Sequence, residues 1–482
     1  ERNFTNKNYL IMKKLLLSAS MLMLAGASAF AVTDGQTYES VDGINCENLW
    51  VFDRFHTEDA YKANPIASTS ARTATTDGTT VYVGLSGETA TIEKFDLKTG
   101  AYLGSLALTK GGEAFSGTLA VNQVGFDEYG HFYAATYSAN SKGDGQYEVY
   151  TVDLTTGAVT SVGDLFFDGG TGRIDYCDVI GDITGAEANA TVMAVTSAAD
   201  NMNVFKWVRE KGSDEWMGGW TDQATFQAIK AGQTYPNGIT GFSLGSVLKI
   251  VRDGSKSGNM NMFYIDGFTS APALYGSDGA MIDNIGNADL KKTNKETGVT
   301  TGTVPEPALG TNGIAEGSVG ETNLMIYSEG QYDDPHKCQA IITTVDENMS
   351  FESMKPLWTV PADGLGQTPD TGTRVHSIFC LPQNDGSALV LTFKCFNGMG
   401  VYKITKKKED SVESNVVAAA NITVNGNVIA VSEVAESIEV FNVAGQKVAE
   451  ARNASEVAAP ATGAYIVKAV VAGAPVVKKV IL

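Results

Sequence analysis

An all-β fold is predicted by three features of the sequence. Gly, Thr, Ser, Asn and Asp are abundant and evenly spread over the 482 residues. Apolar runs are short and often alternate with polar residues, which is the period of a half-buried strand. No long segment keeps the 3.6-residue period of an amphipathic helix. We therefore expect many short strands joined by polar turns.

A short motif recurs 57 residues apart and indicates how the strands are connected. Residues 92–101 read IEKFDLKTGA and residues 149–158 read VYTVDLTTGA. In each copy an apolar, alternating strand ends in an Asp that can accept hydrogen bonds from the turn backbone. A Gly suited to positive φ follows, and then a returning strand. The motif therefore predicts a hairpin.

Similar strand ends recur at intervals of 57, 56, 57, 80 and 59 residues, and the long interval contains a polar insertion at residues 277–311. The six ends are Phe95-Asp96, Val152-Asp153, Val208-Arg209, Ile265-Asp266, Val345-Asp346 and Ile404-Thr405. A period of about 40–60 residues with four strands per unit is typical of a β-propeller blade. We assign each end to the third strand of a blade and expect a six-bladed propeller over residues 45–405. A pair of sandwich domains is the alternative, but it does not explain the even period.

The last unit lacks an outer strand. Residues 376–381, 388–393 and 400–405 supply three strands, after which KKKEDSVES is too charged for a fourth. Asn48 to Phe55, NLWVFDRF, has no blade of its own. We predict that it pairs with residues 400–405 and closes the ring, because both segments would otherwise be exposed edges.

The beginning of the chain reads as an export signal. Residues 12–31 carry two lysines, an apolar run and small residues before Ala31, so residues 1–31 are expected to be a leader that is cleaved after Ala31. No later window approaches the roughly 20 apolar residues of a membrane helix. We expect a bacterial protein that is secreted or displayed at the cell surface.

Charge narrows the partners further. The chain has 35 Lys and Arg against 55 Asp and Glu, and removal of the leader takes away four bases and one acid and leaves a net charge of −23. Such a surface repels phosphate backbones and anionic lipid, which argues against nucleic-acid or membrane-surface binding. Five scattered cysteines do not form a disulfide framework, although a Cys380–Cys395 bridge would be feasible if their strands were neighbours.

The tail differs in composition. After a solvated linker at residues 406–415, residues 416–482 are rich in Val, Ala and Gly, and Asn425-Gly426 is a strong hairpin signal. Together these strands predict a small antiparallel β-sandwich.

The segments IEVFNVAGQKV, TGAYIVK and VVKKVIL of this tail resemble the C-terminal sorting domain of the type IX (Por) secretion system. The resemblance implies recognition by outer-membrane secretion machinery and frequent cleavage of the domain. The matching residues are Gly445, Gly463, Tyr465, Lys478 and Lys479. The Pro-Asn-Pro that usually opens the domain is missing, so a related C-terminal β-module of other function stays open.

No motif in the sequence demands a reaction. The chain has four histidines and lacks His-Glu-x-x-His and phosphate-loop patterns. We predict no catalytic residues, metal or cofactor. The segment FKWVREKGSDEWMGGW predicts a hairpin at Lys211-Gly212 that places Trp207 opposite Trp216, with both packing between blades. Trp220 lies beyond the sheet and is freest to meet a ligand.

A ligand site is expected at the mouth of the tunnel, which the starts of the innermost strands surround. Those starts are polar: Arg72, Asn122, Arg173, Asn237, Asn312, Arg374 and His376. Three arginines near the axis suggest an anion site, since guanidinium groups match carboxylates. The alternative is that these side chains bond strand-end carbonyls and water.

The sequence favours a non-enzymatic binding protein that takes a glycan or a protein ligand at the tunnel mouth. An extracellular polysaccharide hydrolase or lyase is the first alternative, and it would need a pair of carboxylates at the mouth. A structural or adhesive surface protein is the second, and it would have an exposed apolar patch in place of a pocket.

Overall fold

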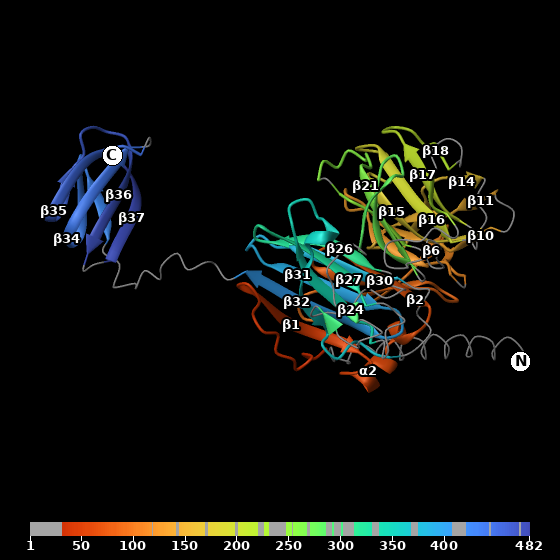
Figure 1. The fold of residues 1–482 in the computed structure, drawn as a ribbon. Helices are drawn as coiled ribbons and strands as arrows, with labels where there is room; N and C mark the ends of the chain where they lie inside the picture. The colour runs from red at the N-terminus through yellow and green to blue at the C-terminus, as the bar shows by residue number, and fades with distance from the viewer. Residues whose placement is uncertain are drawn as a thin grey trace, which may run out of the picture. The chain divides into compact units, whose positions relative to one another are not determined.

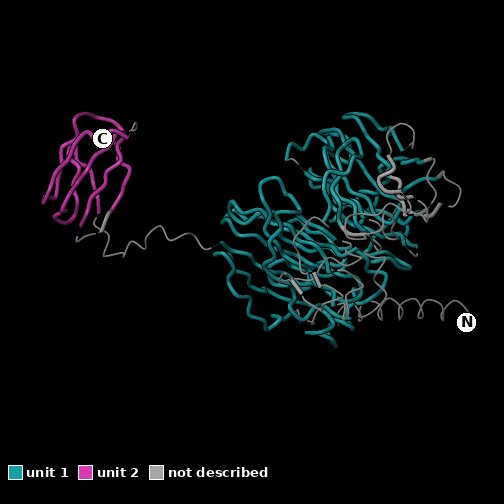
Figure 2. Tube along the Cα trace, viewed as in Figure 1, with its two compact units in different colours: residues 1–406 teal, residues 407–482 magenta. Residues whose placement is uncertain are grey.

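The structure is a computed structural model (Figure 1). It describes residues 31–117, 119–140, 144–168, 172–197, 201–219, 226–230, 247–252, 254–267, 270–285, 292–293, 300–301, 313–329, 337–367, 375–406, 421–442, 445–471 and 474–482. The chain divides into two compact units, residues 1–406 and residues 407–482 (Figure 2). The predicted leader, apart from Ala31, lies outside the described residues, as does all of the predicted linker after Lys406.

Antiparallel sheets follow one another along unit 1. The first has the strand order β2 (Ala71–Thr76), β3 (Thr80–Leu85), β4 (Thr91–Asp96), β5 (Tyr102–Ala107). The next has the order β8 (Gln123–Phe126), β9 (Phe132–Ala135), β12 (Val149–Val152), β13 (Val159–Ser161). It is followed by β15 (Gly172–Gly181), β16 (Ala190–Ser197), β17 (Asn201–Arg209) and β18 (Trp216–Gly218), with β10 (Ser138–Asn140) beside β15 and β19 (Phe226–Lys230) beside β17.

Three further sheets complete unit 1 within the described residues. One is β20 (Val247–Ile250), β21 (Met262–Gly267), β22 (Ser270–Gly276), β23 (Met281–Asn284). Another is β26 (Ile314–Val319), β27 (Thr322–Ser328), β28 (Ala340–Val345), β29 (Lys355–Val360). The last is β30 (His376–Pro382), β31 (Ala388–Lys394), β32 (Gly398–Lys406) and β1 (Ile44–Asp53).

Little else is regular. Two-stranded ribbons join β6 (Thr109–Lys110) to β7 (Glu113–Ala114), β11 (Asp144–Tyr147) to β14 (Leu165–Asp168), and β24 (Lys292–Thr293) to β25 (Thr300–Thr301). The helical turns of the described residues are α2 (Glu58–Lys62) and the 3₁₀ turns Pro65–Ala67 and Phe351–Ser353. The predicted all-β fold is therefore confirmed. No helix in the described part of the chain is long and apolar enough to cross a membrane.

Side-chain hydrogen bonds join the first strands of successive sheets. Thr73 Oγ1 on β2 accepts from the backbone of Val124 on β8 at 2.9 Å, and the side chain of Gln123 on β8 bonds the backbone of Cys177 on β15. Asp178 on β15 accepts from the backbone of Ile250 on β20.

Similar contacts join the first strands of the remaining sheets of unit 1. Lys249 on β20 donates to the carbonyl of Ile314 on β26, and Ser377 on β30 accepts from the backbone of Ala74 on β2. The remaining neighbours, β26 and β30, pack directly, with Gly317 against Cys380. The first strands thus surround a common cavity, which is the arrangement of a β-propeller.

The predicted closing strand is confirmed. β1 pairs antiparallel with β32, with Asn48 opposite Tyr402 and Val51 opposite Gly400 (Figure 1). The strand spans residues 44–53, so it begins earlier than predicted and ends before Phe55. Val32 forms a bridge to Val51 from the other side of β1, which covers part of the edge that would otherwise be exposed.

The recurring hairpin motif has the conformation that the sequence predicts. Oδ1 of Asp96 accepts from the backbone N–H groups of Lys98 and Thr99, and Gly100 has φ of 68°. In the second copy of the motif, Oδ1 of Asp153 accepts from the backbone N–H groups of Thr155 and Thr156, and Gly157 has φ of 76°. These contacts satisfy the turn backbone locally, so the motif ends a strand wherever it occurs.

One sequence prediction about strand order is wrong. Ile265 and Asp266 lie in β21, the second strand of its sheet, and not at the end of the third. Asp266 is buried and makes no turn of the Asp96 type, so a strand-end pattern alone was misleading there. The polar insertion at residues 277–311 also supplies an ordered strand, β23.

The predicted tryptophan pair is also wrong, because the strands are offset by two residues. Trp216 lies opposite Arg209, and Trp207 lies opposite Gly218. Both rings nevertheless pack in a cluster with residues of neighbouring strands, and Trp207 stacks on Tyr147. Their indole N–H groups donate to backbone carbonyls, so both are structural.

Unit 2 is a separate antiparallel sheet. Its strands are β33 (Ile422–Asn425), β34 (Val428–Asn442), β35 (Lys447–Ala458), β36 (Ala464–Val471) and β37 (Ala474–Ile481). β34 pairs with β33, β35 and β36, and its register with β35 shifts between Ala430 and Ala435. One apolar cluster fills its interior, so it has a core of its own.

Candidate functional site

The central cavity has a volume of about 320 Å³. It is lined by residues of β2, β8, β15, β20, β26 and β30, together with Tyr133 of β9 and Tyr264 and Asp266 of β21. A second cavity of about 360 Å³ lies between β20 and β26 and shares lining residues with it, among them Lys249, Tyr264 and Glu316. Clefts of this size that combine apolar walls with a few polar groups are the usual place for a ligand.

One ion pair on the wall of the cavity is fully satisfied. Arg252 binds Asp178 in a bidentate fashion, with N to O distances of 2.8 and 3.1 Å, and Asp178 also accepts from the backbone of Ile250. Burial lowers the pKa of Arg252. The charge and the hydrogen bonds of Asp178 together raise it by more, so the pKa of Arg252 lies above its usual value. This pair is neutral as a whole and serves to fix the wall.

Lys249 contributes a partly buried cation. Its Nζ donates to the carbonyl oxygen of Ile314 at 3.0 Å and lies 5.6 Å from the ring centre of Phe379. Burial lowers the pKa of Lys249, and the neighbouring Arg252 lowers it further. An ammonium group has three hydrogens to donate, so Lys249 can also serve a ligand.

Glu316 and Tyr264 join the sheets that contain β26 and β21. The hydroxyl of Tyr264 donates to Oε1 of Glu316, and both residues line the cavity. Burial, and then the carboxylate of Glu316, raises the pKa of Tyr264, which therefore acts as a hydrogen-bond donor at neutral pH.

Asp266 is a polar group on the cavity wall whose hydrogen-bonding capacity the described residues leave unused. It is 1% exposed and lines the cavity, and among the described residues neither carboxyl oxygen has a hydrogen-bond partner. Burial raises the pKa of Asp266 well above its usual value, although Lys249 and Lys394 oppose this. Buried polar groups without partners are rare in native proteins and often mark function.

The sequence did not single out these residues as a site. Lys249 interrupts the apolar run VLKIV at residues 247–251, and Asp266 follows FYI at residues 263–265. A charge within an otherwise apolar strand was the available signal. The sequence does not show which charged side chains meet, because Lys249 and Asp266 lie on different strands of the sheet.

Three of the predicted ligand residues are described with their side chains, and all are buried. Arg72 on β2 bonds the hydroxyl of Tyr176, which accepts from the backbone of Val375. Asn122, directly before β8, donates to the carbonyl of Asp175.

His376, the first residue of β30, lines the cavity and contacts the hydroxyl of Thr392 through Nε2. Arg72 and Asn122 adjoin Thr73 and Gln123, which line the cavity themselves. The anion-binding role of this group stays a prediction.

The other predicted ligand residues cannot be placed. Arg173 lies on β15, but its side chain is outside the described residues. Trp220, Asn237, Asn312 and Arg374 lie wholly outside the described residues.

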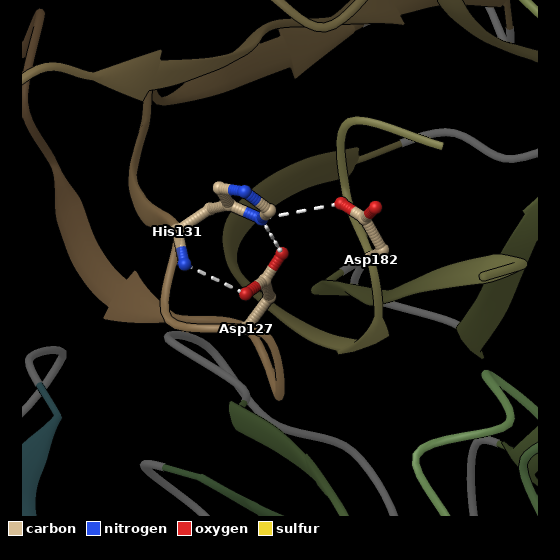
Figure 3. A group of neighbouring side chains, drawn as sticks. All are labelled: Asp127, His131 and Asp182. Atoms are coloured by element: carbon tan, nitrogen blue, oxygen red, sulfur yellow. Dashed lines mark hydrogen bonds and ion pairs between the residues drawn. The ribbon is translucent and has the colours of Figure 1, made fainter. Parts of the chain in front are cut away.

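A second cluster of ionisable groups, Asp127, His131 and Asp182, has the residue types of a metal site (Figure 3). Asp127 follows β8 and His131 precedes β9, so both belong to one hairpin, whereas Asp182 follows β15 in the next sheet. Nδ1 of His131 lies 2.9 Å from Asp127 and 3.2 Å from Asp182 (Figure 3).

The carboxylates of this cluster are already occupied by protein donors. Asp127 accepts from the backbone N–H groups of Tyr129, His131 and Ile183. Asp182 accepts from the backbone and hydroxyl of Thr184 and from the backbone of Glu187. Burial raises the pKa of Asp182, but these hydrogen bonds and His131 lower it more. The cluster is best described as a latch between two neighbouring sheets.

The cysteines offer no redox site. All five are free and buried. Burial raises the pKa of Cys177, Cys338 and Cys380 to about 12, so their thiols are protonated and poorly reactive at neutral pH.

The residues that carry the sorting resemblance lie at turns and on the last strands of unit 2. Gly445 has φ of 77° in the turn after β34, and Gly463 exchanges backbone hydrogen bonds with Leu482. Tyr465 is buried, and Lys478 donates to the carbonyl of Ile422 at 2.6 Å. Lys479 is exposed and lies opposite Ile466.

Comparison with known proteins yields only distant structural similarity. No family model matches the sequence, and no curated protein matches it. Among solved structures, the subtype N10 neuraminidase-like protein of A/little yellow-shouldered bat/Guatemala/060/2010 is 8% identical, with a TM-score of 0.37 over 78% of this chain and 99% of that chain. The Penicillium chrysogenum alpha-L-arabinanase complexed with arabinobiose is 10% identical, with a TM-score of 0.40 over 70% of this chain and 94% of that chain. Similarity at this level assigns neither a family nor an activity.

Proposed function

We propose that this chain is an exported, non-enzymatic binding protein whose residues 45–405 form a six-bladed β-propeller and take a glycan or a protein ligand at the central cavity. The observation that carries the proposal is Asp266, a buried carboxyl group on the cavity wall with no hydrogen-bond partner among the described residues. A bound ligand would supply the missing partners, which compensates for the unfavourable burial.

The cavity also counts against a purely structural or adhesive role, which predicts no pocket. Its walls combine the aromatic rings of Phe126, Tyr133 and Phe379 with the polar groups of Lys249 and Asp266. This mixture is typical of a ligand site, where apolar walls supply affinity and a few polar groups supply orientation.

A glycan array, followed by isothermal titration calorimetry of retained glycans, tests the proposal. We expect the protein to bind a restricted set of saccharides and the variant Lys249→Met to bind them at least tenfold more weakly. Lys249→Met keeps most of the length of the side chain and removes its charge. A protein that retains no glycan and no surface protein would contradict the proposal.

A hydrolase or lyase acting on extracellular polysaccharide is the second candidate, and the same residue favours it. A buried carboxyl group with a raised pKa can act as a general acid, and Glu316 and Asp178 place two further carboxyl groups on the same cavity wall. Release of reducing ends from retained glycans, abolished in Asp266→Asn with binding preserved, would favour this candidate. Binding without any product would favour the first.

Export and sorting complete the proposal. Residues 1–31 act as a secretory leader, and residues 416–482 act as a sorting module read by outer-membrane secretion machinery, which delivers the protein to the cell surface or medium. The separate core of unit 2 supports an independent module. Deletion of residues 416–482 in the native host should retain the protein inside the cell envelope. Normal delivery of the shortened chain would reject sorting and favour a module of other function.

A further inference from the structure

We propose that Asp266 determines the class of ligand, and that this ligand is a single, uncharged sugar unit whose neighbouring hydroxyl groups bond the two oxygens of Asp266. The inference rests on the proposed binding function and goes further by naming the chemistry that the cavity selects. It follows from the position of Asp266, from the charges around it and from the size and walls of the cavity.

The position of Asp266 requires a ligand with hydrogen-bond donors. The residue lies on β21 opposite Val247 of β20, and it is 1% exposed. A carboxyl group in such a place costs several kcal/mol unless it is hydrogen-bonded. Adjacent hydroxyl groups of a sugar ring are spaced to meet both oxygens of one carboxyl group.

The surrounding charges disfavour a charged ligand. Asp178 and Arg252 neutralise each other in a bidentate pair, and among the described residues that line the cavity Lys249 and Glu316 then remain as groups of opposite charge. An anionic ligand would approach Glu316, and a cationic ligand would approach Lys249. A neutral ligand with both donors and acceptors avoids either repulsion, and hydroxyl groups provide both.

The walls and the volume indicate one sugar unit. Phe126, Tyr133, Tyr264 and Phe379 line the cavity and can contact the apolar faces of a sugar ring. The volume of about 320 Å³ is at the lower end of the range for ligand pockets, so the cavity holds one small unit and not a long segment of chain.

Asp266 should also reduce the stability of the empty protein. Replacement of a carboxyl group that stabilises the fold lowers the free energy of unfolding. A carboxyl group that serves a ligand and has no partners in the empty protein destabilises the fold, so its replacement raises the free energy of unfolding. Asp178 provides the matched comparison, because it lines the same cavity and is fully hydrogen-bonded.

The experiment uses the full chain and titrates it by calorimetry with neutral monosaccharides, with the corresponding uronic acids and with the corresponding amino sugars. Wild type, Asp266→Asn, Asp266→Ala and Asp178→Asn are compared, and thermal unfolding of each is recorded without ligand. We expect wild type to prefer a neutral sugar. The two Asp266 variants should bind it about 10- to 100-fold more weakly, and their midpoints should rise by about 2 °C or more. The midpoint of Asp178→Asn should fall.

The outcomes separate two failures. This inference is overturned if the protein binds a charged saccharide, or if both Asp266 variants bind the saccharide as tightly as wild type does. The proposed binding function then stays in place. A fall in the unfolding midpoint of both Asp266 variants makes Asp266 structural and also overturns it. No binding of any sugar or glycan by wild type overturns the inference together with glycan binding.

Discussion

Oδ2 of Asp53 lies 2.8 Å from Nδ1 of His56, at the point where the closing strand β1 ends. Nε2 of the same ring lies 3.2 Å from Oδ1 of Asp363, which follows β29 in the preceding sheet. The imidazole therefore ties the end of β1 to a loop of a different sheet. We therefore expect the contact between the end of β1 and this loop to depend on pH.

Replacing His56 should reduce stability mainly at low pH. The hydrogen bond to Asp53 raises the pKa of His56, although burial opposes it, so the Asp53–His56 pair keeps its proton to higher pH than free imidazole would. The contribution of this pair to the free energy of unfolding is complete below the pKa of about 6.5 that His56 has in the unfolded chain. It is lost as the pH rises through the pKa of His56 in the folded protein. His56→Gln should lower the free energy of unfolding by about 2 kcal/mol at pH 5.5 and by less at pH 9. Chemical denaturation at both pH values measures this, and an equal loss at both would refute it.

Trp50 should be critical for ring closure. It is 1% exposed on β1, and its indole N–H donates at 2.9 Å to the carbonyl of Leu97, which directly follows β4. Trp50→Ala leaves a cavity and should cost about 3–5 kcal/mol. Trp50→Phe keeps most of the ring and should cost clearly less. Urea unfolding followed by circular dichroism compares the two, and equal losses would show that the hydrogen bond matters and the packing does not.

Gly100 should tolerate replacement less well than Gly78. Both have positive φ, 68° and 88°, so Ala introduces backbone strain of about 1–2 kcal/mol at either position. At Gly100 a Cβ atom would also lie 2.7 Å from the ring of Trp50, whereas at Gly78 nothing lies within 4 Å. The unfolding midpoint should therefore fall further for Gly100→Ala than for Gly78→Ala. Equal midpoints would mean that Trp50 moves aside freely.

The pair of Asp178 and Arg252 should be more costly to break at Arg252 than at Asp178. Arg252→Met leaves the buried Asp178 without its partner and should cost about 3–5 kcal/mol, whereas Asp178→Leu leaves Arg252, whose side chain is 34% exposed, in contact with water and should cost less. The double variant removes both charges and should be less destabilised than the sum of the two single variants. A double-mutant cycle from denaturant unfolding gives the coupling energy, and strict additivity would contradict the pairing.

The latch of Asp127, His131 and Asp182 should act without a metal. Its carboxylate oxygens already accept hydrogen bonds from backbone and hydroxyl groups. Neither EDTA nor added Zn²⁺ or Ca²⁺ should change the unfolding midpoint, whereas Asp127→Asn should lower it. A rise with Zn²⁺ in wild type that disappears in His131→Gln would instead identify a metal site.

Much of the fold of unit 1 could be predicted because its signals are local. The Asp96 and Asp153 turns satisfy their own backbone, so their meaning does not depend on distant residues. The error at Ile265-Asp266 arose because the same two residue types can also lie within a strand. There the burial of Asp266, and not its sequence neighbours, decides its role.

The candidate site was only partly accessible to the same reasoning. Residues at the starts of the first strands were expected near the axis, and His376 does line the cavity. Lys249 and Asp266 were missed, because their significance depends on burial and on groups that are distant in the sequence, namely Ile314 of β26 and Phe379 of β30 for Lys249 and Lys394 of β31 for Asp266.

By itself the sequence determined the period of the strands, the chemistry of the turns and the need for a closing strand, since alternation, Asp and Gly positions and an unpaired edge act over a few residues. Only the tertiary structure decided which buried charges meet and which are left without partners. The reason is physical. The pKa and the hydrogen bonds of Asp266 and Lys249 are set by the dielectric and by the groups that the circular arrangement of sheets brings around them, and the order of residues along the chain contains neither.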